Sequence, residues 1–436
     1  MPPVITSKRG LDIPLQGAAP KILEQTPLPK SISVKPTDFR GLTPTLLVKE
    51  GETVSAGTPL FADKYRPRIL FTTPLGGKVA AVVRGAKRKL LEIRIEAQEE
   101  VAPLRFTAAR PYLLSREQIV TTLLQSGCWP NIRQRPYGII ADPEQTPRAI
   151  FISAFDTAPL APDLDFILAE HQADLQYGID ILYRLCPERI HWSIHSRTPQ
   201  NGVVRRVNKV HLHTFTGPHP CGNVGVQIHH IAPLSKGEVI WTVDPQAVII
   251  IGRLFATGLL DARKIVALTG PSAPEPCYIS TIPGMPLHRL PQIGLFNPRV
   301  RYISGNCLTG ENVGFNGSLG FYHSQITLLP EGDYQVLLGW AKLWRSIRKH
   351  PQDTNTRGGV RAFVMNNLYA KVLPMDIYPV YLLKAILSGA IDQMEALGIY
   401  EVIEEDFALC EYVCPSKIEI QNILGRGIDL MIKEMS

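Results

Sequence analysis

The chain has 436 residues, which at roughly 150 residues per domain predicts about three domains. An apolar fraction of 45% excludes global disorder, and the lack of any apolar run of about 18 residues excludes an integral membrane protein. The net charge of +7 leaves nucleic acid, an anionic membrane surface or an acidic partner open. Seven mostly distant cysteines, and a start without the apolar core of a signal peptide, predict a reduced, cytoplasmic protein.

The first hundred residues divide into two parts. Residues 1–40 are Pro-rich, and we expect an irregular, extended segment. Residues 41–105 hold short alternating apolar runs separated by turns, which predict a small β module. The stretch Val48–Leu60 resembles the lipoyl/biotinyl barrel-sandwich pattern. The turn 84–89, where carrier proteins of this type hold a modified lysine, is basic and lacks flanking methionines, so a scaffold is favoured over a carrier.

Residues 106–270 predict a Rossmann-like α/β domain, because apolar strands alternate with helices. A capping box at Ser115–Gln118 opens the first helix. Buried or alternating strands are expected at 149–153, 190–194, 210–215 and 265–269, with a further helix at 245–254. Residues 271–330 predict a small β-rich, β-grasp-like module, and residues 331–436 a helical domain with helices at 377–388, 393–397 and 418–433.

Signals for a nucleotide or a metal are weak. Neither a dinucleotide fingerprint nor a P-loop occurs, and the glycines of 314–320 lie between β segments, where a tight loop is the simpler interpretation. Seven of the eleven histidines lie between 191 and 230. His211 and His213 would share one face of a strand, but only Cys221 is a nearby further ligand, so we predict no metal site.

A basic and aromatic turn follows the first predicted helix. Arg133, Arg135 and Tyr137 place two guanidinium groups beside an aromatic ring, next to Pro136. Such a turn could bind an anionic or quinone-like ring by hydrogen bonding and stacking, or it could be a solvated surface loop.

Two cysteines near the C-terminus match half of an iron–sulfur motif. Cys410, Cys414 and Pro415 fit the end of the ferredoxin-type run C-x2-C-x2-C-x3-C-P. Counting back, the first two positions hold Glu404 and Phe407, so the run cannot supply the four thiolates that a cluster takes. The segment is interpreted as a degenerate ferredoxin-type segment, with a redox-active dithiol as the alternative.

Five segments, in order along nearly the whole chain, resemble the A subunit of the sodium-translocating NADH:quinone reductases. They are Arg9–Gly17, Gly217–His229, Arg301–Gly310, Leu373–Ile377 and Glu405–Pro415. The stretches 20–40 and 340–358 depart from the family pattern, so we expect different partner contacts there.

The resemblance implies a peripheral subunit on the cytoplasmic face of the bacterial inner membrane, in a six-subunit complex that oxidises NADH, reduces ubiquinone and exports sodium. It implies that the chain itself binds no redox cofactor, and that FMN, FAD, riboflavin and iron–sulfur centres are on partner subunits. It also implies that the membrane-embedded B subunit is its neighbour at the quinone-reducing end. We expect no nucleic-acid partner.

Quinone reduction needs hydrogen-bond donors for two carbonyl oxygens and a source of protons. The candidates for quinone or partner binding are Arg133, Arg135, Tyr137, His219 and His229. Two alternatives stay open. One is an NADH- and FMN-binding electron-input subunit of the Rnf or complex I type, which would carry a flavin or iron–sulfur absorption band. The other is a lipoyl or biotinyl carrier, which an intact mass would reveal.

Overall fold

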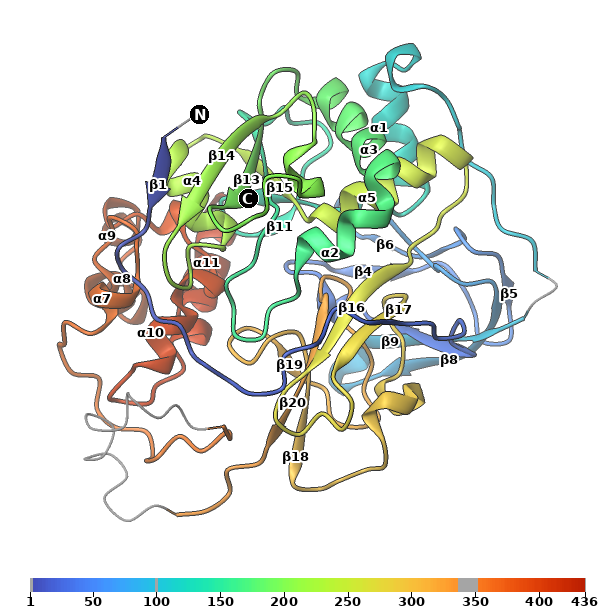
Figure 1. The fold of residues 1–436 in the computed structure, drawn as a ribbon. Coiled ribbons are helices and arrows are strands. Elements are labelled where there is room, and N and C mark those ends of the chain that lie inside the picture. The colour runs from blue at the N-terminus through green and yellow to red at the C-terminus, as the bar shows by residue number, and fades with distance from the viewer. Residues whose placement is uncertain (1–2, 99–100, 336–351, 436) are drawn as a thin grey trace.

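Four β-sheets and a group of short helices make up the computed structural model, which describes residues 3–98, 101–335 and 352–435 (Figure 1). Most of the divergent 340–358 stretch therefore lies outside the described residues. Among the helices of those ranges, none has the length and apolarity that crossing a bilayer requires.

The first β module consists of two small sheets. The four-stranded sheet has the order β3-β9-β8-β5 and the three-stranded sheet the order β4-β6-β7. Their strands are β3 (Ser31–Val34), β4 (Pro44–Leu46), β5 (Thr53–Val54), β6 (Pro59–Asp63), β7 (Leu70–Thr72), β8 (Gly77–Arg84) and β9 (Leu90–Ala97). Apolar side chains from both sheets, such as Leu60, Phe71 and Ile93, fill the space between them and are almost fully buried.

The N-terminal 40 residues are not a separate extension, in contrast to our expectation. They supply β1 (Val4–Thr6), β2 (Leu23–Glu24) and β3, and each of these strands joins a different sheet. β1 pairs in parallel with β14 (His211–Thr216), and β2 pairs in parallel with β17 (Cys277–Thr281). Strands of two to four residues give almost no periodic signal, so the sequence pattern could not indicate them.

A seven-stranded sheet forms the centre of the α/β part, with the order β1-β14-β13-β12-β15-β10-β11. Its first five strands are parallel, and β10 and β11 are antiparallel additions at one edge. The elements are α1 (Arg116–Gln125), β10 (Ile132–Arg135), β11 (Ile139–Ile140), β12 (Ile150–Ser153), α2 (Leu164–Leu168), α3 (Gln172–Leu185), β13 (Ile190–His195), β14, α4 (Val224–Ile231), β15 (Ile240–Val243) and α5 (Pro245–Thr257). The capping box is confirmed, because Ser115 and Gln118 cap α1 reciprocally.

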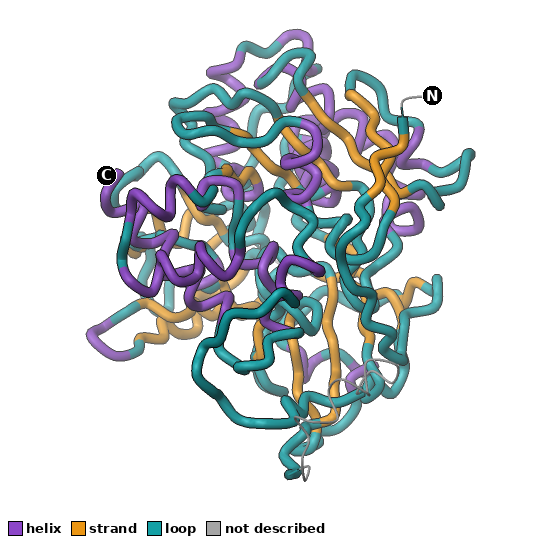
Figure 2. Tube along the Cα trace, turned by 90° about the vertical axis from the view of Figure 1, so that its left-hand side faces the viewer, coloured by secondary structure: helices purple, strands orange, loops and turns teal. Residues whose placement is uncertain are grey.

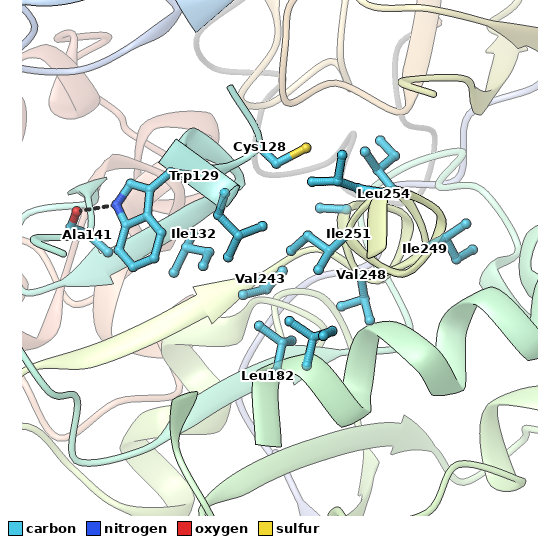
Figure 3. Packing of buried hydrophobic residues seen from close by; sticks show 14 of the residues in the cluster. Cys128, Trp129, Ile132, Ala141, Leu182, Val243, Val248, Ile249, Ile251 and Leu254 are labelled. Carbon is cyan, nitrogen blue, oxygen red and sulfur yellow. Dashed lines mark hydrogen bonds between the residues drawn. The ribbon is translucent and has the colours of Figure 1, made fainter. Parts of the chain in front are cut away.

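One face of this sheet packs against α1, α3 and α5. Trp129 lies in this core, where its Nε1 donates to the carbonyl oxygen of Ala141 at 2.8 Å (Figure 3). Its ring meets the ring of Trp241 edge to face, with the centroids 5.4 Å apart. The core continues into the barrel module, which fixes that module against α1.

A six-stranded sheet follows, with the order β19-β18-β20-β16-β17-β2. Its further strands are β16 (Lys264–Thr269), β18 (Val300–Ser304), β19 (Glu311–Asn312) and β20 (Gln325–Pro330). The strand at 265–269, which we placed in the α/β domain, belongs to this sheet instead, since it pairs with β17 and β20. All six residues of β16 are buried, so its apolar run is equally typical of either sheet.

The C-terminal helices pack on the second face of the seven-stranded sheet. They are α7 (Tyr369–Val372), α8 (Pro379–Ser388), α9 (Ile391–Ala396), α10 (Ala408–Tyr412) and α11 (Ile420–Met435). Phe151 and Ile240 of the sheet share a core with Leu382, Leu383 and Leu424 of these helices. Figure 2 shows the helices gathered around the C-terminus on one side of the molecule.

Helices α3 and α5 touch backbone to backbone at two glycines. A Cβ added to Gly252 would overlap the carbonyl oxygen of Asp174, and one added to Gly178 would overlap that of Val248. We expect Gly252→Ala to lower the free energy of unfolding by about 1–3 kcal/mol, because the helices must separate. Urea unfolding measures this. The control is Gly359→Ala, where no described atom lies within 4 Å of the added carbon; equal effects of the two substitutions would contradict the packing argument.

Candidate functional site

The candidate site is a cavity of about 110 Å³ where three parts of the chain meet. The barrel module supplies residues 33–39 and 71–74, the α/β part supplies residues around β10 and α5, and the six-stranded sheet supplies residues around β16 and 321–322. For scale, an apolar protein cavity of about 150 Å³ can hold benzene. The cavity is smaller than that, but several times larger than the roughly 10–15 Å³ that one water molecule needs.

Aromatic rings form one wall of the cavity. The ring of Phe39 lies 4.5 Å from that of Phe71, 4.9 Å from that of Phe321 and 5.8 Å from that of Tyr322, between centroids. Two hydrogen bonds fix these rings: the Tyr322 hydroxyl donates to the carbonyl oxygen of Pro130 at 2.7 Å, and the Phe321 amide donates to Asp38 Oδ2 at 2.8 Å. Burial raises the pKa of Tyr322 above its ordinary value.

Cationic side chains share the cavity with these rings. The Arg133 guanidinium lies over the ring of Tyr322, 4.8 Å from the centroid. Lys264 is only 7% exposed, and its Nζ donates to the carbonyl oxygen of Phe321 at 3.0 Å. Burial lowers the pKa of Lys264 to about 8, while Asp244 and Asp38 counter this effect. The cavity thus combines an aromatic wall with N–H donors, an arrangement that suits a planar ligand bearing carbonyl or anionic oxygens.

The position of Lys264 depends on an amide side chain. Gln246 of α5 accepts a hydrogen bond from the Ile265 amide at 2.7 Å and donates to the Ile265 carbonyl oxygen at 2.9 Å. This pair of hydrogen bonds has the pattern of two paired strands and joins β16 to α5.

A second cation of the cavity, Lys35, lies 3.5 Å from the Asp38 carboxylate, and burial raises the pKa of Asp38.

Arg133 is the predicted site residue that lines this cavity, whereas Arg135 lies in a different environment. The Arg135 side chain is 3% exposed and forms ion pairs with Asp406 at 2.6 Å and Glu405 at 2.7 Å. Its Nη1 also donates to the carbonyl oxygen of Glu401 at 3.3 Å. Burial raises the pKa of Asp406, and the nearby guanidinium acts against that shift. Arg135 therefore joins the sheet to the C-terminal helices.

Tyr137 and His229 also lie at this contact with the C-terminal segment. His229 Nε2 accepts the Asp376 amide at 3.0 Å, so Nδ1 carries the proton and donates to Glu401 at 2.7 Å. The Tyr137 ring meets that of Tyr400 with the centroids 6.2 Å apart, and its buried hydroxyl has no partner in the described ranges. Burial raises the pKa of Tyr137.

His219 lies in the loop before α4, beyond the ends of the parallel strands. Its amide donates to Asp12 Oδ1 at 2.8 Å, and its Nδ1 lies 3.1 Å from the Thr157 hydroxyl oxygen. Its Nε2 is buried without a partner among the described residues. Burial lowers the pKa of His219 to about 4, so the ring is neutral at pH 7. The structure thus brings Arg135, Tyr137 and His229 to one contact and leaves Arg133 at the cavity.

Cys410 and Cys414 are both fully buried in the core of the C-terminal helices. The Cys414 sulfur lies 2.9 Å from the Tyr369 hydroxyl oxygen, and Cys410 lies 3.9 Å from the Tyr369 carbonyl oxygen. Burial raises the pKa of Cys410. Across the described ranges, no three His, Cys, Asp or Glu side chains are arranged to hold a metal ion, and this includes the histidines of β13 and β14.

Several cavity residues carried no signal in the sequence. Lys35, Asp38, Lys264 and Tyr322 come from three distant segments, and none belongs to a motif. Lys264 is the first residue of β16, directly before its apolar run, and this position gave no indication that the side chain is buried. The glycine-rich loop 314–320, which we interpreted as a tight loop, directly precedes Phe321 and Tyr322, but it gave no indication that these two residues line a cavity.

Three family models match the chain. They are described as the NqrA N-terminal barrel-sandwich hybrid domain (residues 5–98), the NqrA second alpha/beta domain (residues 114–260) and the NQRA C-terminal domain (residues 265–314). The predicted barrel-sandwich module is confirmed. The Rossmann-like, β-grasp-like and ferredoxin-type assignments stay predictions, as do the domain boundaries apart from the placement of residues 1–40 and 265–269 described above.

Curated relatives match over nearly the full length. A protein of Serratia proteamaculans is 36% identical over 97% of this chain and 98% of its own. One of Neisseria meningitidis is 34% identical over 99% and 100%, respectively. Both are named as the A subunit of Na(+)-translocating NADH-quinone reductase. An NAD+-reducing [NiFe]-hydrogenase structure aligns with a TM-score of 0.41 and 11% identity over 75% of this chain and 62% of that chain, too low to carry an argument.

The Arg135 ion pairs generate a stability prediction. Arg135→Ala leaves the fully buried Asp406 carboxylate uncompensated, so we expect a loss of about 3–5 kcal/mol in the free energy of unfolding. The double substitution Arg135→Met with Asp406→Leu should cost less, since it removes both charges. Urea unfolding measures both, and Glu405→Gln, at the more exposed partner, is the milder control. A double variant as unstable as Arg135→Ala would count against this account.

Proposed function

Because the chain belongs to the NqrA family, the A subunits of the Na(+)-translocating NADH-quinone reductases, we propose that it is a peripheral component of the ubiquinone-reducing end of that complex. It contributes to quinol formation next to the B subunit, on the cytoplasmic face of the membrane, in a complex of six subunits. It holds no redox cofactor of its own, so electrons reach the quinone from centres on partner subunits. A flavin or iron–sulfur absorption band in the purified chain would contradict this last point.

The observation that carries the quinone role is the composition of the cavity. A quinone head group is a planar ring with two carbonyl oxygens, which become more negative as the ring is reduced. The rings of Phe39, Phe321 and Tyr322 offer faces and edges for stacking, and Arg133 and Lys264 offer N–H donors. Donors in a water-poor cavity stabilise such charge more strongly than donors in water do.

Lys264 also suits the proton requirement. Quinol formation takes two electrons and two protons, and a lysine with a pKa near 8 holds a proton at neutral pH but releases it more readily than an exposed lysine. Asp38 lies 3.5 Å from Lys35 in the same cavity, and its negative charge favours the protonated form of Lys264. Lys264 was absent from the sequence-based candidates.

The other predicted residues stay predictions. Tyr137 and His219 each keep a buried polar atom without a partner in the described ranges, which leaves them able to bind a ligand group. Arg135 and His229 already direct their polar atoms at protein partners. We therefore assign Arg135 a positioning role between the sheet and the C-terminal segment.

Photo-crosslinking of the complex purified from membranes tests the quinone site. A photoreactive quinone analogue should label peptides that contain residues 33–39, 127–133 or 321–322. Arg133→Gln should raise the KM for quinone roughly tenfold to a hundredfold, because it removes a charge-assisted hydrogen bond. Arg299→Gln, at an exposed arginine, is the matched control. Labelling confined to the partner chains, with unchanged kinetics for Arg133→Gln, would reject the assignment.

The pH dependence of the reaction tests Lys264. As the pH rises through about 8, Lys264 loses its proton, so the KM for quinone should rise between about pH 7 and pH 9 in the native complex. Lys264→Met should show a high KM without that step, and Lys264→Arg, which stays charged, should show a low KM over the same range. Steady-state kinetics at constant ionic strength provide the measurement. A step that persists in Lys264→Met assigns the titration to another group.

A further inference from the structure

The hairpin between β8 and β9 carries a dense cluster of positive charge. Arg84, Lys87, Arg88 and Lys89 lie within six residues, and this segment contains no carboxylate. All four are exposed. Within the described residues none forms an ion pair, and the contact of Arg84 is a hydrogen bond from its Nη1 to the carbonyl oxygen of Arg88 at 3.2 Å. Four charges without counterions are a large share of the net +7 of the chain.

Two carboxylates on or beside the strands of the hairpin bond other groups. Glu92 Oε1 accepts from Arg94 Nε at 2.7 Å, and Glu50 Oε1 accepts from the Val82 amide at 2.7 Å. Neither forms an ion pair with a cation of the hairpin. The region therefore presents a positive potential that an external anion can satisfy.

A groove of about 370 Å³ runs beside the hairpin. Arg84, Arg88 and Lys89 line one side of it. Leu42, Pro44 and Leu46, from the start of the barrel, and Leu90 supply apolar lining, and Thr43 completes the set. Two further leucines close by in the sequence are exposed, Leu47 by 49% and Leu91 by 37%. Cationic and apolar surfaces thus adjoin at one place.

The backbone of the hairpin tip is strained. Lys87 and Arg88 have φ angles of 52° and 59°, a left-handed conformation that side chains other than glycine, asparagine and aspartate rarely adopt. Two consecutive residues of this kind form a two-residue hairpin turn, closed here by the hydrogen bond from the Lys89 amide to the Ala86 carbonyl oxygen at 3.1 Å, and the turn presents both cationic side chains at the tip.

We propose that the basic hairpin and its groove bind the phosphate head groups of anionic membrane lipids. Clusters of four or more lysines and arginines bind anionic lipid surfaces, and each cation adds roughly fivefold to the affinity. The apolar side chains beside the cluster match the boundary between head groups and acyl chains. The proposal rests on the peripheral membrane location given under Proposed function and adds the surface that faces the lipid.

An acidic peptide is the less favoured occupant. A peptide that adds to a sheet edge needs a row of free main-chain groups, and the strand along the groove, β4, has three residues and begins with Pro44, which has no N–H. A lipid head group needs no such row. The cluster is also too small, and too poor in aromatic side chains, for a nucleic-acid groove.

Vesicle sedimentation with the full chain tests the proposal. The chain should sediment with vesicles of phosphatidylcholine and phosphatidylglycerol and not with phosphatidylcholine alone, and added salt should release it. The combined substitution Arg84→Gln, Lys87→Gln, Arg88→Gln and Lys89→Gln should lower the affinity on the order of several hundredfold. The control replaces four scattered exposed cations, Lys8, Arg289, Arg299 and Lys371, by glutamine, which gives the same net charge.

Two results would overturn the proposal. Equal losses in the hairpin variant and the control would mean that net charge alone drives adsorption. Unchanged vesicle binding, together with failure of the hairpin variant to co-purify with the complex, would assign the hairpin to an acidic protein partner. Circular dichroism confirms folding of both variants. Quinone photo-labelling of the same variants reports on the cavity separately, so failure of the quinone role and failure of lipid binding give different results.

Discussion

One buried guanidinium, that of Arg135, connects the seven-stranded sheet to the C-terminal segment. It neutralises Asp406, whose side chain is 0% exposed, and it pairs with Glu405 beside it. The Asp406 carboxylate also accepts the Ile403 amide at 2.9 Å, so the turn before α10 depends on the same charge. A carboxylate at this depth is stable only with such a partner. This contact therefore helps to hold the start of α10, the helix that contains Cys410.

The sequence predicted those elements whose pattern is local. The capping box at Ser115, the apolar run of β12 and the barrel-sandwich pattern at 48–60 each carry their signal within about a dozen residues, and each has its predicted element in the structure. Pairing between distant strands has no such signal. The short strands β1 and β2 and the sheet to which β16 belongs were therefore missed or misplaced.

In the candidate site, too, the sequence indicated local features but not the contacts between distant segments. Arg133 and Arg135 are close neighbours in the chain and were indistinguishable as sequence candidates, since both are basic and both flank the same turn. Their roles differ because their neighbours differ: the Tyr322 ring for one and two carboxylates for the other. The two carboxylates lie 270 and 271 residues away from Arg135 along the chain, and Tyr322 is also far from Arg133. No spacing rule could have separated the two arginines.

Lys264 shows how the cavity depends on the modules that surround it. Moving an ammonium group out of water is costly, and here the cost is offset by the Phe321 carbonyl oxygen and by the field of Asp38 and Asp244. These partners come from the second sheet, the barrel and the start of α5, so the lysine is accommodated only where all three parts meet. A displacement of any of the three parts would leave the buried Lys264 charge with fewer partners. Such a displacement would therefore raise the free energy of the folded chain. Lys264 supplies the cavity with an N–H donor, and the same buried charge stabilises the arrangement of the three parts that form the cavity.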